Sequence, residues 1–102
     1  MSVGTGSYMN PRDGDVVEIA VDTSDGFVHV TRVSVRGCAA AKRVAAEVSL
    51  RSRLRTPEDA ARIEPTELIH RLELLPDEER CALTVVAAFR AALVDAHVKT
   101  LA

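Results

Sequence analysis

The sequence predicts an α+β domain in which helices pack on one face of a small antiparallel β-sheet. Segments with the alternation of β-strands lie in the early part of the chain, and segments rich in helix-forming residues make up the rest. Strands that come first and helices that follow are typical of this fold class. The length of 102 residues fits one domain, which we expect to cover residues 1–102.

Two strands are predicted after a small, polar lead-in over residues 1–12, which we expect to be loose. The first covers residues 16–21, where valine and isoleucine alternate with other side chains. A turn over residues 22–26 leads to the second, over residues 27–36. The valines of this second strand change face partway along it. A β-bulge near residues 31–32 would restore one apolar face; alternatively, both faces are partly buried.

Helices are predicted over the remainder of the chain. Residues 39–54 are rich in alanine, arginine, lysine and glutamate, and T-P-E-D at residues 56–59 has the hydroxyl cap, proline and acids of a helix start. A short helix follows in E-P-T-E-L-I-H-R-L, and a proline separates it from a long terminal helix. The terminal helix carries residues at helical spacing that predict one buried stripe: Cys81, Val85, Ala88, Phe89, Ala92 and Ala96.

Composition argues against several function classes. The net charge of −2 and the pI near 5.9 give no electrostatic footprint for nucleic acid, and aromatic residues at 3% offer few platforms for stacking bases. No uninterrupted apolar run approaches the roughly 20 residues of a membrane span, and no signal pattern opens the chain. We therefore expect a cytoplasmic protein that binds neither nucleic acid nor membrane. In that compartment, two cysteines favour metal binding, sulfur chemistry or plain packing over a disulfide.

Four candidate site residues lie where predicted elements begin or end. Asp13 and Asp15 precede the first predicted strand. Cys38 follows Gly37 at the boundary between strand and helix, and Cys81 lies in the first turns of the terminal helix. The ends of elements can converge at one pole of a small domain. Helix N-termini stabilise thiolates, and two thiolates with one or two carboxylates could hold zinc or iron.

The same residues also have simpler interpretations. The aspartates around Gly14 could form a turn before a strand, since aspartate and glycine are common in turns. Cys81 could be a small buried apolar residue of the helix stripe. Arg80 could be a solvated helix residue paired with Asp77 or Glu78.

The order of four motifs resembles the U-type iron–sulfur cluster scaffolds, the family of the NifU N-terminal domain, IscU and SufU. The motifs are N-P-R-D-G-D-V-V-E-I-A-V, G-C-A-A-A, T-P-E-D-A-A-R-I and E-L-L-P-D-E-E-R-C-A-L. The resemblance implies a SufE/NifU-like fold with about three strands. It also implies a monomeric or homodimeric carrier rather than a classical enzyme. Such a scaffold takes persulfide sulfur from a cysteine desulfurase, holds a labile [2Fe–2S] cluster or Zn²⁺, and supplies an acceptor apo-protein.

The resemblance also implies a role for each candidate residue. Cys81 would be the first sulfur acceptor, Cys38 a second ligand and second candidate acceptor, and Asp15 the ligand that keeps the cluster labile. Asp13 stands where the family has its first cysteine and would be a substitute metal ligand. Arg80 stands where the family usually has histidine; it cannot bind metal but would favour the neighbouring thiolate. An oxygen ligand at position 13 should weaken cluster binding, whereas zinc tolerates it.

These departures leave two other functions open. A degenerate homologue could keep the fold and act as a partner-binding or regulatory subunit. A thiol or metal catalyst could reuse the site, with Cys38 or Cys81 as nucleophile and Asp13 as its acid–base partner. Uptake of iron and sulfide distinguishes a scaffold from the first alternative, and turnover that a Cys38→Ala variant loses would support the second.

Overall fold

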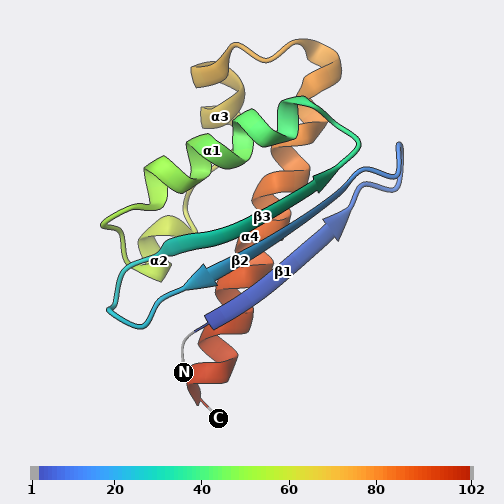
Figure 1. Ribbon diagram of the computed structural model, residues 1–102. Helices are drawn as coiled ribbons and strands as arrows, with labels where there is room; N and C mark the ends of the chain where they lie inside the picture. Colours follow the sequence, from blue (N-terminus) through green and yellow to red (C-terminus); the bar gives the residue numbers. More distant parts are fainter. Residues whose placement is uncertain (1–2, 102) are drawn as a thin grey trace.

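Three strands followed by four α-helices make up residues 3–101, the part of the chain that this computed structural model describes (Figure 1). The strands are β1 (Val3–Met9), β2 (Val16–Asp22) and β3 (His29–Arg36). The helices are α1 (Ala40–Ser52), α2 (Pro57–Ala60), α3 (Pro65–Leu72) and α4 (Glu79–Leu101), and a 3₁₀ turn (Pro76–Glu78) precedes α4.

The sheet has the order β1-β2-β3, and both pairs of neighbours are antiparallel. One face of the central strand carries the buried side chains of Val17, Ile19 and Val21. Helices α4 and α1 pack on this face, whereas Glu18 and Arg32 on the opposite face are exposed (Figure 1). The predicted α+β class, with about three strands and helices on one face, is therefore confirmed.

The predicted bulge in β3 is also confirmed. The register of the β2–β3 pair shifts between Ala20 and Val21, where β3 contains the extra residue Thr31. Because side chains alternate along a strand, one extra residue returns the following valines to the face of the preceding ones. As a result, Val30 and Val33 both lie toward α1.

The loose lead-in predicted for residues 1–12 is wrong over Val3–Met9, which forms the edge strand β1. Two glycines conceal this strand in the sequence, because glycine lacks the alternating apolar side chains that mark a strand. In the structure a Cβ at either Gly4 or Gly6 would overlap the backbone of α4 at Ala92. Glycine weakens an isolated strand, but here it permits the direct approach of a helix.

The buried stripe predicted for the terminal helix is confirmed by α4. Its members are each at most 2% exposed: Cys81, Val85, Ala88, Phe89, Ala92 and Ala96. By length and composition, residues Pro76–Leu101 could cross a membrane, although charged residues interrupt the apolar run. In the structure, 56% of the most apolar window of this segment is buried inside the fold, as in the core helix of a globular domain.

A charged contact reinforces the packing of β1 on α4. The backbone N–H of Thr5 donates to the Asp95 carboxylate at 2.9 Å, and Lys99 Nζ lies 3.0 Å from the same carboxylate. The Thr5 N–H and then the Lys99 ammonium hold the pKa of Asp95 below its ordinary value of 3.8. Because the folded-state pKa is the lower one, ionised Asp95 stabilises the fold above the unfolded-state pKa.

We expect this contribution to disappear as the pH falls through the folded-state pKa of Asp95. Asp95→Asn keeps an oxygen acceptor for Thr5 but removes the charge. At about pH 6 the wild type should have the higher urea midpoint, and the two midpoints should converge as the pH falls below 3.8 and through the lower folded-state pKa. A difference that persists at the lower pH would show that ionisation is not its source.

A side chain at Gly6 should separate β1 from α4. We expect Gly6→Ala to lower the free energy of unfolding by about 1–3 kcal/mol, because its Cβ would overlap the helix backbone. The exposed neighbour on the same strand offers a matched control, and Ser7→Ala should change stability by less than about 0.5 kcal/mol. Urea unfolding followed by circular dichroism measures both, and equal values would contradict the proposed close contact.

Candidate metal and sulfur site

Three of the predicted site residues converge at one end of the sheet. Asp15 directly precedes β2, Cys38 directly follows β3 and its turn, and Cys81 lies in the first turn of α4. A carboxylate oxygen of Asp15 and the two sulfur atoms lie within 4.8 Å of one another. Cys81 is buried, and the other two residues are partly exposed, so the group is reached from the side of Asp15 and Cys38.

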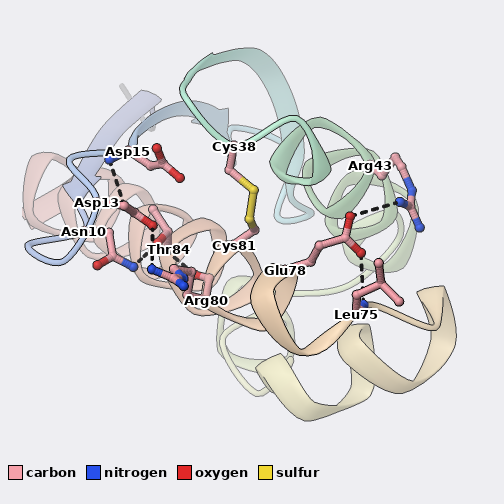
Figure 2. The surroundings of a disulfide bond; sticks show 10 residues. All are labelled: Asn10, Asp13, Asp15, Cys38, Arg43, Leu75, Glu78, Arg80, Cys81 and Thr84. Carbon is pink, nitrogen blue, oxygen red and sulfur yellow. Dashed lines mark hydrogen bonds and ion pairs between the residues drawn. A yellow bond between two sulfur atoms is a disulfide. The ribbon is translucent and has the colours of Figure 1, made fainter.

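Cys38 and Cys81 are joined in a disulfide (Figure 2). The sequence interpretation placed a disulfide last among the uses of these cysteines, and the structure corrects it. The residues are 43 positions apart, but folding brings their Cα atoms to 6.4 Å, within the range of protein disulfides. The earlier ranking rested on the expected cellular compartment, which carries no information about the distance between two remote cysteines. Reduction must therefore precede any role of the two sulfurs as thiolates.

Gly37 determines where the Asp15 carboxylate lies. Gly37 has φ +108°, a backbone conformation that L-residues rarely adopt, and this conformation turns the chain from β3 toward Cys38. A Cβ at this position would overlap the Asp15 side chain. Because Gly37 has no side chain, the Asp15 carboxylate can lie against this turn. The role of Gly37 in the site is therefore to leave space for that carboxylate.

Asn10 anchors the loop that carries both aspartates, and sequence reasoning missed this residue. Its backbone N–H donates to the Asp15 carbonyl at 2.8 Å, and its side-chain Oδ1 accepts from the Arg12 N–H at 2.9 Å. Its side-chain Nδ2 donates to Thr84 Oγ1 of α4 at 3.3 Å, and Asn10 is buried. An asparagine before a proline is typical of a turn, so only the fold reveals that this one is buried.

Asp13 lies outside the converging group and makes two other contacts. Its Oδ1 accepts from the Asp15 N–H at 3.0 Å, and its Oδ2 lies 3.4 Å from Nη1 of Arg80 (Figure 2). Arg80 therefore pairs with a residue 67 positions away rather than with its helix neighbours. The assignment of Asp13 as a metal ligand stays a prediction.

A second set of polar contacts supports the start of α4 from the other direction. Arg43 Nη2 donates to the Leu72 carbonyl at 3.1 Å, and Arg43 lies 4.0 Å from Glu78. Glu78 in turn accepts from the backbone N–H of Leu75 at 2.9 Å. In Figure 2 the disulfide lies between this set and the loop that contains Asp13. These contacts connect α1, α3 and the turn before α4, and so help to hold Cys81 in place.

A groove with a volume of about 600 Å³ borders the same end of α4. Arg12 and Arg80 are the charged residues that line it. The other lining residues are neutral: Tyr8, Asn10, Pro11, Pro76, Leu83 and Ala87. The groove is therefore apolar, with cationic side chains and no carboxylate among its lining residues.

Two sulfurs and a carboxylate at one pole of a small α+β domain define a class of protein. Once reduced, such a set suits a soft metal ion or an iron–sulfur cluster, and its partial exposure suits transfer better than permanent storage. The fold and the site thus define a small α+β protein with the donor set of a metal–sulfur site.

Known proteins give this class a family. The chain is 31% identical over 100 residues to the mitochondrial iron sulfur cluster assembly protein 1 of Kluyveromyces lactis, and 32% identical over 96 residues to that of Eremothecium gossypii. These matches cover 96% and 92% of the chain but only 56% and 62% of the two relatives. No family model matches the chain.

A bacterial relative matches over more of its own length. The iron–sulfur cluster assembly scaffold protein IscU of Rickettsia prowazekii is 30% identical over 95 residues, which cover 92% of this chain and 72% of the relative. The chain belongs to the IscU family of iron–sulfur cluster assembly scaffolds. The predicted family is therefore confirmed.

Replacing Gly37 should damage the site more than the fold. We expect Gly37→Ala to displace Asp15 and weaken zinc binding by the reduced protein at least about tenfold, with a stability cost of about 1–3 kcal/mol. Gly26→Ala is the matched control, because Gly26 also has a positive φ, +90°, but has no neighbouring atom within 4 Å of the added Cβ. Equal zinc affinities in the two variants would show that Gly37 serves only the turn.

Proposed function

We propose that this chain assembles or carries iron–sulfur clusters, and that its reduced form binds iron or zinc through Asp15, Cys38 and Cys81. The observation that carries the proposal is the convergence of these three donors within 4.8 Å at one end of the sheet. Two thiolates provide the soft ligands that iron–sulfur clusters prefer, and the carboxylate oxygen weakens retention of the cargo. Family membership supports the scaffold role.

Reduction is the first step of this function. A dithiol donor supplies two electrons and two protons to the Cys38–Cys81 disulfide and is itself oxidised to a disulfide. Both cysteines then lose their protons as they bind the metal. The oxidised and metal-bound forms of the chain are thus mutually exclusive.

Sulfur acceptance is the second proposed step. A cysteine thiolate attacks the outer sulfur of a donor persulfide, the donor's S–S bond breaks, and the donor leaves as a thiolate. The family resemblance assigns first acceptance to Cys81, yet Cys81 is only 2% exposed and Cys38 is the more accessible sulfur. Mass spectrometry of single-cysteine variants after exposure to a desulfurase and cysteine would decide the order.

The partners follow from this chemistry. We propose a cysteine desulfurase as sulfur donor and an acceptor apo-protein as destination, with a cytoplasmic carrier acting as a monomer or homodimer. The names of its relatives include mitochondrial and bacterial proteins. The chain would then act as a carrier rather than as a classical enzyme.

One observation favours a second candidate function, that of a degenerate partner-binding or regulatory subunit. By the sequence resemblance, Asp13 stands where the family has its first cysteine and Arg80 where it usually has a histidine, and the two side chains form an ion pair here. A chain that no longer builds clusters could keep this pair as a purely structural contact. Reduced protein that binds neither iron with sulfide nor zinc would favour this function.

Metal uptake should require reduction and all three donors. We expect reduced, anaerobic protein to bind about one zinc ion, or iron with sulfide, per chain. Oxidised protein, Cys38→Ser and Cys81→Ala should bind little, and Asp15→Asn should bind more weakly. Elemental analysis with sulfide determination measures the stoichiometry.

The controls for this experiment separate ligation from folding. Asp25→Asn removes a carboxylate in the exposed β2–β3 turn and should leave metal uptake unchanged. Circular dichroism of each variant shows whether buried Cys81 can be replaced without unfolding. Unchanged stoichiometry in a folded Cys38→Ser variant would contradict the proposed site.

A further inference from the structure

Strand β3 forms one edge of the sheet (Figure 1). Within residues 3–101, β2 is the only strand that pairs with it. The backbone N–H and C=O groups along the outer side of an edge strand have no partner in the sheet and can pair with an added strand. Beyond the bulge at Thr31, the register is regular from Arg32 to Arg36. This segment therefore offers a regular template for another strand.

A groove between β3 and α1 follows this edge. It has a volume of about 390 Å³, and its apolar or small lining side chains are those of Val30, Val33, Val35, Ala45, Ala46 and Ser49. The short side chains of α1 leave this space open, because longer ones would cover β3. As a result Val33 is still 39% exposed, although it lies on the helix side of the strand. Apolar side chains of an added strand could fill the groove and cover Val33.

The charged groups around this edge are cationic. Arg32 and Arg36 lie on the open face of the sheet, away from the helices, and Lys42 of α1 lines the groove. Arg32 pairs with Glu18 at 3.1 Å, whereas in the described part of the chain Arg36 and Lys42 form no ion pair. No carboxylate lines the groove. An acidic strand beside β3 would therefore meet cations on both of its faces.

The same charges disfavour a second copy of the chain as the occupant of the edge. Antiparallel pairing of β3 with itself, centred on Ser34, would place the arginines of the two copies opposite each other. Like charges that face each other directly across two strands destabilise a sheet. Charge complementarity thus favours an acidic partner over a copy of this chain.

We propose that the β3 edge binds an extended, acidic segment of another protein by strand addition. Side chains of the segment that point toward α1 are apolar and fill the groove, and the alternate side chains are carboxylates that face Arg32 and Arg36. Main-chain hydrogen bonds supply the affinity, and the alternation supplies the specificity. Because β3 leads through Gly37 to Cys38, a partner on this edge lies beside the segment that carries a site cysteine. The proposal does not depend on metal binding.

A blocked peptide of about seven residues, in which valine and glutamate alternate, is a suitable probe because it has the length of a typical strand. When it is titrated into the isotope-labelled, oxidised protein, the amide signals of Val30–Arg36 and of the groove residues of α1 should shift. Hydrogen exchange along β3 should become slower. Shifts centred on β1, the other edge of the sheet, or no shift at millimolar peptide would overturn the proposal.

Altered peptides test the backbone and apolar contacts separately. One peptide carries methyl groups on its valine nitrogens and a second on its glutamate nitrogens. One of the two should bind at least about tenfold more weakly than the parent, since one set of N–H groups faces β3. Serine in place of valine should also weaken binding, because it removes the apolar contact. Undiminished binding of both methylated peptides would show docking by side chains alone and would contradict strand addition.

Charge reversal tests where the carboxylates bind. Arg36→Glu should weaken binding of the glutamate peptide by about three- to tenfold and strengthen binding of a peptide with lysine in place of glutamate. Arg62→Glu is the matched control, because it makes the same change at an exposed position outside the groove. It should leave both affinities unchanged. Equal effects of the two variants would reduce the attraction to net charge and refute the assigned surface.

Sedimentation of the chain alone tests the other occupant. We expect no dimer that protects the β3 amides from hydrogen exchange. A concentration-dependent dimer with such protection, which the glutamate peptide does not dissociate, would assign the edge to a second copy and overturn the proposal.

Discussion

Gly4 and Gly6 let the backbone of β1 lie directly against the backbone of α4, and the remaining elements are arranged around this contact. This contact sets the distance between α4 and the sheet. Helix α1 then packs beside α4 and over β3 on the same face of the sheet. The same contact carries the end of β1 toward the start of α4, where Asn10 can reach Thr84. The position of the aspartate loop in the site therefore depends on the close packing of edge strand β1 against α4.

The site is held in place by the residues around it more than by attractions between its own functional groups. Asn10 ties the aspartate loop to α4, and Gly37 leaves space for the Asp15 carboxylate. Glu78 and Arg43 support the start of the helix that carries Cys81. Such supporting residues keep the candidate ligand atoms in position when no metal is bound, which is what the proposed function requires.

Chain order suggested only that Asp13, Asp15, Cys38 and Cys81 could converge, and the structure brings the last three together. Periodicity was sufficient to predict the bulge at Thr31 and the buried stripe of α4. Each of these features is expressed in local residue types. β1 was missed because glycines replace its apolar side chains. The disulfide and the Asp13–Arg80 pair depend on distances between remote segments, which local patterns do not encode.

The disulfide has a consequence for the stability of the chain in its different redox states. A bond that closes a 43-residue loop restricts the unfolded chain and stabilises the fold by about 4 kcal/mol in a loop-entropy description. A metal or cluster bound as proposed between the same two sulfurs would impose a comparable restraint. The reduced chain without cargo has neither restraint, and a domain of this size has little stability to spare. Under the proposed function, the reduced chain without cargo is therefore the form most exposed to proteases, and the cell would retain mainly molecules that are loaded or oxidised.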